Sequence, residues 1–126
     1  MIVALFQFEL LVRGSESLKD KRRVVKSVKD RLHREHLAAV AEVGRLDSHT
    51  VAQMALALVG TDGRHLGEVL DAITNKLRAL LDAELGACSR RFIRDVDDLP
   101  DSPDDTPDRD ALAAEMLRHF DAPERP

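Results

Sequence analysis

Basic side chains crowd one segment of the chain, in a pattern that favours binding over catalysis. Residues 17–36 contain eight Lys or Arg and three Asp or Glu. Four of the cations fall within the first turn and a half of a predicted helix, namely Lys19, Lys21, Arg22 and Arg23. Exposed cations at a helix N-terminus oppose the helix dipole, at about 0.3–1 kcal/mol each. A basic cluster beside free helical N–H groups therefore indicates a site for phosphate or another anion.

The segment that carries these cations also has an apolar face. Its apolar residues recur at helical spacing, as Leu18, Val24, Val25, Val28 and Leu32. Ser17 is a good N-cap with Asp20 three residues later, so we predict a helix from there to about Glu35. Lys21 falls on the apolar side. We expect either that its stem extends over the sheet edge or that its ammonium forms a structural ion pair with a carboxylate such as Glu42.

Alternating and periodic patterns predict the remaining elements. Residues 2–12 alternate and are apolar on both faces, which predicts a central strand. Further strands are predicted at 38–46, 50–59 and 88–96. A second helix follows the turn at 60–63, and Gly86 is placed to end it. Its apolar stripe comprises Leu66, Val69, Leu70, Ile73, Leu77, Leu80 and Leu81.

The order β-α-β-β-α-β predicts a ferredoxin-like α+β domain over residues 1–96, with a four-stranded antiparallel sheet and two helices on one face. Residues 1–94 carry a net charge of +4, whereas residues 95–126 carry −8. Seven Asp and three Pro make residues 97–110 an expected acidic linker. Residues 111–121 can form a short amphipathic helix for a protein partner, or a disordered tail.

Composition narrows the class of protein. The 126 residues suffice for one domain, and 44% hydrophobic content favours a folded chain. No apolar run approaches the ~18 residues that a membrane span needs, and we expect no signal peptide. The single cysteine, Cys88, cannot form an intramolecular disulfide, which favours a cytoplasmic location. We expect Cys88 to be a small core residue.

Within this fold, the first helix begins at the end of the sheet where the second and third strands connect. We therefore expect its cations to lie near Arg45, and near Arg90 and Arg91 if the fourth strand begins there. The predicted anion- or RNA-binding set is Lys19, Lys21, Arg22, Arg23, Lys26, Arg45, Arg90 and Arg91. The alternative is a solvated helix face plus one structural ion pair, Lys21–Glu42.

The aromatic content limits the mode of RNA contact. The chain has no Trp or Tyr, and Phe6 and Phe8 lie on the expected core face. Bases therefore lack a stacking platform, and any RNA contact should be to phosphates and sensitive to salt. The other sheet face carries Val3, Leu5 and two alanines, Ala55 and Ala57. Homodimerisation through that face or an edge strand is our expectation, with a tail helix folding over it as the competing one.

Catalytic constellations are not evident. Acylphosphatases share this topology and hold phosphate with an Arg in the first strand–helix loop. Arg13 lies in about that loop, but Glu16 would repel phosphate and the third strand has no Asn. His33 and His36 have metal-compatible spacing without an apparent third ligand. We expect no enzyme activity, catalytic residue, metal or cofactor.

Several stretches together resemble the YlxP-like family of small bacterial proteins of unknown function. They are the first strand with its Gly-Ser turn, SLKDKRRVVKSVKDRL at 17–32, AVAEV at 39–43 and DGRHLGEVLD at 62–71. The resemblance covers residues 1 to about 96 and implies a ferredoxin-like fold with a role near RNA or the ribosome. The chain departs from the family at His36-Leu37 and Ser48-His49, where Asn-Phe and a Trp are frequent. The expected function is a non-enzymatic cytoplasmic accessory protein that contacts RNA; the alternative is a dimeric protein-interaction or small-anion module.

Overall fold

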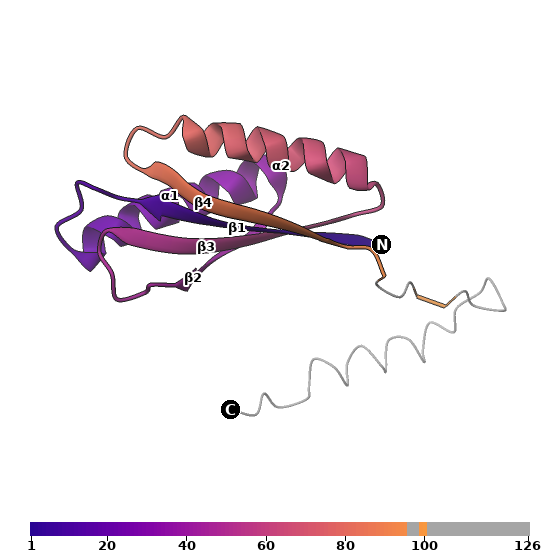
Figure 1. The fold of residues 1–126 in the computed structure, drawn as a ribbon, viewed down its shortest axis with the longest axis horizontal. Coiled ribbons are helices and arrows are strands. Elements are labelled where there is room, and N and C mark those ends of the chain that lie inside the picture. The colour runs from indigo at the N-terminus through magenta and orange to yellow at the C-terminus, as the bar shows by residue number, and fades with distance from the viewer. Residues whose placement is uncertain (96–98, 101–126) are drawn as a thin grey trace, which may run out of the picture.

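The computed structural model describes residues 1–95 and 99–100. Four strands and two helices follow in the order β-α-β-β-α-β, and both helices cover one face of the sheet (Figure 1). The elements are β1 (Ile2–Leu11), α1 (Leu18–His36), β2 (Ala39–Gly44), β3 (Val51–Gly60), α2 (Gly63–Arg78) and β4 (Glu84–Ile93). The predicted ferredoxin-like arrangement is confirmed.

The sheet is antiparallel throughout, with the strand order β2-β3-β1-β4. The first strand is central, as its two apolar faces predict, and it pairs with β3 from Ile2↔Gly60 to Leu11↔Val51. The two edge strands are β2 and β4. They lie three strand spacings apart, roughly 14 Å, because neighbouring strands are about 4.8 Å apart.

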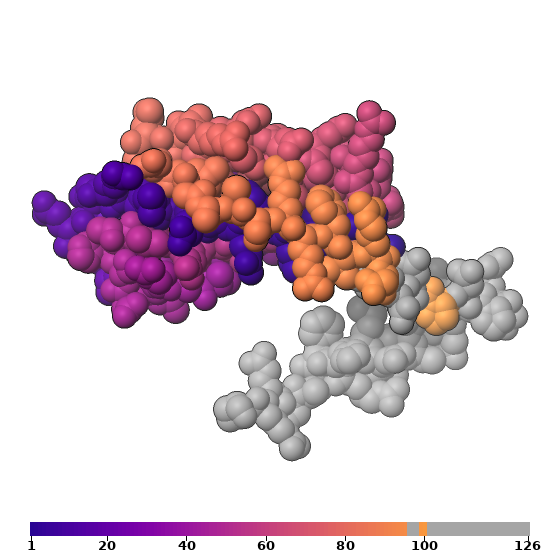
Figure 2. All heavy atoms as spheres, in the orientation of Figure 1, coloured from indigo at the N-terminus to yellow at the C-terminus, as the bar shows by residue number. Residues whose placement is uncertain are grey.

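One hydrophobic core fills the space between the sheet and the helices. Alternate residues of β1 and β3 point into it, and the two helices add one apolar stripe each. In the space-filling view, side chains of α2 meet those of β4 along the upper part of the molecule (Figure 2). The large apolar side chains with the least exposed surface are Phe6, Leu10, Leu32, Met54, Leu56, Leu70, Ile73 and Leu77.

Capping residues set where each helix begins. The Ser17 hydroxyl accepts a hydrogen bond from the Asp20 backbone N–H at 3.2 Å, and the Asp20 carboxylate accepts one from the Glu16 N–H. Asp62 caps α2 by accepting from the Arg64 N–H at 3.0 Å. These bonds satisfy N–H groups that lack partners within the helix, as the sequence predicts.

The end of α2 and the start of β4 differ from the prediction. The helix ends at Arg78, and Gly86 lies inside β4 rather than terminating the helix. The fourth strand begins at Glu84, four residues earlier than predicted, because it pairs with β1 up to Leu11↔Glu84. Leu81, expected in the helix stripe, lies in the connection and is fully exposed.

Cys88 is also exposed, contrary to the core position that we expected. It lies on β4, which is an edge strand, so no further strand covers it. The expected linker 97–110 and helix 111–121 lie outside the described residues apart from Leu99 and Pro100. Among the described residues, no helix is both long enough and apolar enough to span a membrane.

Candidate functional site

Lys21 is the most deeply buried charged residue described, with 1% of its surface exposed. Its Nζ lies 2.8 Å from Oε2 of Glu42, whose side chain is 15% exposed. It also donates hydrogen bonds to the carbonyl oxygens of Arg45 and Val51, at 2.9 and 3.3 Å. The structure thus contains the Lys21–Glu42 pair. Because its ammonium is buried among these three oxygens, Lys21 does not belong to the anion-binding set in which we had placed it.

The bonds from Lys21 fasten the β2–β3 connection to the first turn of α1. Arg45 and Val51 are its two ends, and one ammonium holds the carbonyls of both. Within the connection, Arg45 adopts a left-handed backbone with φ 54°, and its carbonyl accepts from the Ser48 N–H at 3.0 Å. The backbone of Arg45 therefore lies beside the N-terminal turn of α1, and its side chain is exposed to solvent.

Two of the three basic side chains on the flank of α1 toward α2 are matched by carboxylates, and the third, Arg34, has no ion pair with the described residues. Arg23 lies 3.4 Å from Asp20, and Arg31 lies 3.3 Å from Glu35. Glu35 also pairs with Lys76 of α2. This flank faces α2, since Arg31 and Lys76 line the same hollow between the helices. The predicted binding residue Arg23 thus has an acidic partner.

The opposite flank of α1 carries cations with fewer partners. Lys19, Arg22, Lys26 and Lys29 fall within an arc of about 80°, because successive helical residues step by about 100°. Lys26 pairs with Asp30 at 2.7 Å. The other three have no ion pair with the described residues. We call these four residues and Arg45 the outer basic stripe. We had not selected Lys29, although its spacing of seven from Arg22 places it on the same flank.

Arg90 and Arg91 lie apart from the outer basic stripe, on the opposite edge strand. Arg90 bonds to Asp71 and Thr74 of α2, at 2.8 and 3.1 Å, and its guanidinium lies over the Phe6 ring. Arg91 is opposite Leu5 and shares the open sheet face. They are separated from α1 because β4 begins at Glu84, which moves both residues to the middle of the strand.

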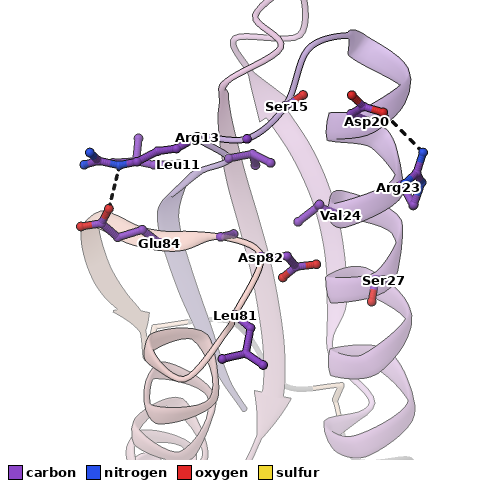
Figure 3. A pocket seen from close by; sticks show the side chains of 13 residues that line it. Leu11, Arg13, Ser15, Asp20, Arg23, Val24, Ser27, Leu81, Asp82 and Glu84 are labelled. Atoms are coloured by element: carbon purple, nitrogen blue, oxygen red, sulfur yellow. Dashed lines mark hydrogen bonds and ion pairs between the residues drawn. The ribbon is translucent and has the colours of Figure 1, made fainter.

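A cleft of about 740 Å³ opens between α1, the β1–α1 loop and the α2–β4 connection (Figure 3). Arg13 and Glu84 form an ion pair at its rim, with 2.9 Å between Nε and Oε2. Val24 and Ser27 of α1 line the other side, together with Asp82 from the connection. Sequence reasoning missed this cleft because the predicted second helix was too long and covered the residues that form the connection.

The open face of the sheet carries mostly small and branched apolar side chains. Leu5 lies between Ala57 on β3 and Arg91 on β4, in register. Val59 and Val43 on the flanking strands are 67% and 55% exposed. This surface is where the sequence places dimerisation.

The two histidines of α1 have separate partners. His33 Nδ1 lies 3.3 Å from the Ala38 carbonyl, whereas His36 Nε2 lies 2.7 Å from Nζ of Lys76. Burial, and secondly the charge of Lys76, lower the pKa of His36 below its usual 6.5. The hydrogen bond from Lys76 lowers the pKa of Glu35. Within the described residues, no cluster of three His, Cys, Asp or Glu can hold a metal.

Comparison with curated proteins finds no match. A family model does match residues 3–90, which include every helix and nearly every strand residue described above. Since this match spans more than half of the chain, the protein belongs to the family described as "Protein of unknown function (DUF503)".

Proposed function

We propose that the protein is a non-enzymatic cytoplasmic accessory factor that binds the phosphate backbone of structured RNA, in or near the ribosome, through the outer basic stripe. Membership in the YlxP-like family is part of this proposal. The observation that carries it is the unequal pairing of cations on the two flanks of α1.

If these cations served only solubility, the share of them paired with carboxylates should be similar on the two flanks of α1. Within the described residues, two of three cations on the α2 side have a carboxylate partner, and Arg34 has none. On the outer side only Lys26 of the four helix cations has one, and Lys19, Arg22 and Lys29 have none. Lys21 adds a second segment to this surface by holding the base of Arg45 in place. A row of positive charge with few acidic partners suits the regular phosphates of a nucleic-acid backbone.

The fold leaves little room for base-specific readout by stacking. Phe6 and Phe8 are 1% and 2% exposed and stack on each other inside the core. Phe92 is half-buried beneath the Arg94 guanidinium. Recognition should therefore follow RNA shape and charge, with weak sequence preference.

The test is the affinity of the full chain for a labelled RNA hairpin, measured by fluorescence anisotropy at several salt concentrations. We expect affinity to fall with salt at a slope of about 0.7–0.9 per phosphate contacted. The double substitution Lys19→Glu with Arg22→Glu should weaken binding at least tenfold at low salt and reduce the slope.

The matched control is Arg64→Glu with Arg78→Glu, which changes the net charge equally on exposed positions of α2. It should retain most of the affinity. Equal losses in the two variants would mean that only net charge matters, and absence of binding at low salt would contradict the proposal.

The open sheet face favours a second candidate, a homodimeric interaction module with no nucleic-acid role. Its support is the exposed apolar surface around Leu5, Ala57 and Val59. Sedimentation of the wild type would show a dimer that Ala57→Arg abolishes, while Ala72→Arg on the exposed side of α2 leaves it intact. A monomer at all concentrations would contradict this candidate.

A further inference from the structure

The cleft beside α1 has an excess of negative charge over positive. Its two arginines already have partners, because Arg13 pairs with Glu84 and Arg23 with Asp20. Asp82 forms no ion pair or hydrogen bond with the described residues. Asp82, which is exposed, thus has no described cation within ion-pair distance, although it also borders the adjoining hollow that Arg31 and Lys76 line.

Apolar surface lies next to that carboxylate. Figure 3 shows Asp82 directed toward the side of α1 that carries Val24 and Ser27, with Leu81 just below it. Leu81 is fully exposed and lines the mouth of the cleft. The part of the lining around Asp82 therefore combines a carboxylate, a hydroxyl and two aliphatic side chains.

We propose that this cleft is a binding site for a small organic cation, a primary ammonium attached to an apolar body. Its volume lies within the usual range of ligand pockets, about 300–1,000 Å³. The ammonium donates hydrogen bonds to the Asp82 carboxylate, and the body packs between Val24 and Leu81. Small anions are disfavoured because the arginines are neutralised and Asp82 repels negative charge. This site is separate from the outer basic stripe and does not depend on RNA binding.

Three probes with one phenyl body and different charge test the proposal directly. They are 2-phenylethylamine, 2-phenylethanol and 3-phenylpropionate, each titrated into ¹⁵N-labelled full-length protein at pH 7 and followed by amide chemical shifts. We expect saturable shifts at residues 11–15, 23–27 and 81–84 with the amine. Its affinity should exceed that of the alcohol by about two- to fivefold, as an exposed ion pair contributes up to about 1 kcal/mol. The carboxylate should bind weakest.

Substitutions assign the contributions to residues. Asp82→Asn should lower the affinity for the amine to that for the alcohol. Leu81→Ser should weaken the binding of both probes by the same factor. Asp47→Asn, an exposed carboxylate on the β2–β3 connection, is the matched control and should change nothing. The proposal is overturned if the amine produces no saturable shifts up to its solubility limit. It also fails if the carboxylate binds as tightly as the amine, or if Asp82→Asn leaves the preference for the amine intact. If a variant does not fold, the comparison of the amine, the alcohol and the carboxylate on the wild-type protein decides the outcome.

Discussion

Replacing Lys21 with Met should be among the most damaging single substitutions in this chain. The change removes a buried ammonium and leaves three oxygens behind it: the Glu42 carboxylate and the carbonyls of Arg45 and Val51. Breaking a buried ion pair by removing one partner costs about 3–5 kcal/mol. Because Glu42 is 15% exposed and gains some hydration, we expect the lower part of this range, about 3 kcal/mol.

Two companion variants separate the parts of this interaction. Glu42→Gln removes the charge of the acid but preserves both carbonyl hydrogen bonds of Lys21, so we expect a smaller loss of about 1–2 kcal/mol. The double variant Lys21→Met with Glu42→Leu removes both charges. It should be less destabilised than Lys21→Met alone, because no unpaired carboxylate remains next to the core.

The assay is urea unfolding followed by circular dichroism at pH 7, with an unchanged m-value required for the comparison. The matched control is Lys19→Met, an exposed position two residues earlier on the same helix, where we expect a change within about 0.5 kcal/mol. A loss below about 1 kcal/mol for Lys21→Met, or one equal to that of Lys19→Met, would refute our account of the buried ammonium.

Three further predictions concern other parts of the molecule. Because the pKa of His36 is lowered in the folded state, the unfolded chain binds more protons, and the free energy of unfolding should fall as pH drops from 7.5 to 5.5. Urea titrations across that range should show a weaker pH dependence for His36→Gln. Leu70→Ala should cost about 2–5 kcal/mol by urea unfolding because Leu70 is fully buried, whereas Leu81→Ala, from the same predicted stripe, should change stability by less than about 0.5 kcal/mol. Replacing the seven Asp of residues 97–110 with Asn should tighten RNA binding several-fold at low salt, with the difference closing at high salt, because a tethered acidic segment competes with phosphate. Equal anisotropy curves for the two chains at low salt would contradict that competition.

Elements whose residues pack on one continuous face were predictable from local pattern. The alternation in residues 2–12 predicted a strand, and its apolar residues on both faces favoured a central position, which the strand order confirms. Ser17 marked the start of α1 and the turn at 60–63 marked that of α2, because capping is decided by neighbours within three residues. The basic cluster could also be predicted from the sequence, although its members differ in burial and in ion pairing.

Other features depended on partners far away in the chain. The stripe in α2 continues in the sequence to Leu81, but the helix ends at Arg78, where pairing between β1 and β4 requires the chain to become extended. The same pairing moved Arg90 and Arg91 away from α1. It also created the α2–β4 connection, and with it the cleft around Asp82.

The sequence by itself determined the order of the elements, the helix starts and the positive charge of α1, because each follows from periodicity or from contacts within a few residues. Only the tertiary structure decided how those charges are used. Lys21 and Glu42 are separated by a helix and part of a strand, and the sequence left open whether they meet. The pairing of Glu35 with Lys76 depends on which flank of α1 faces α2, and that is fixed when both helices pack on one face of the sheet.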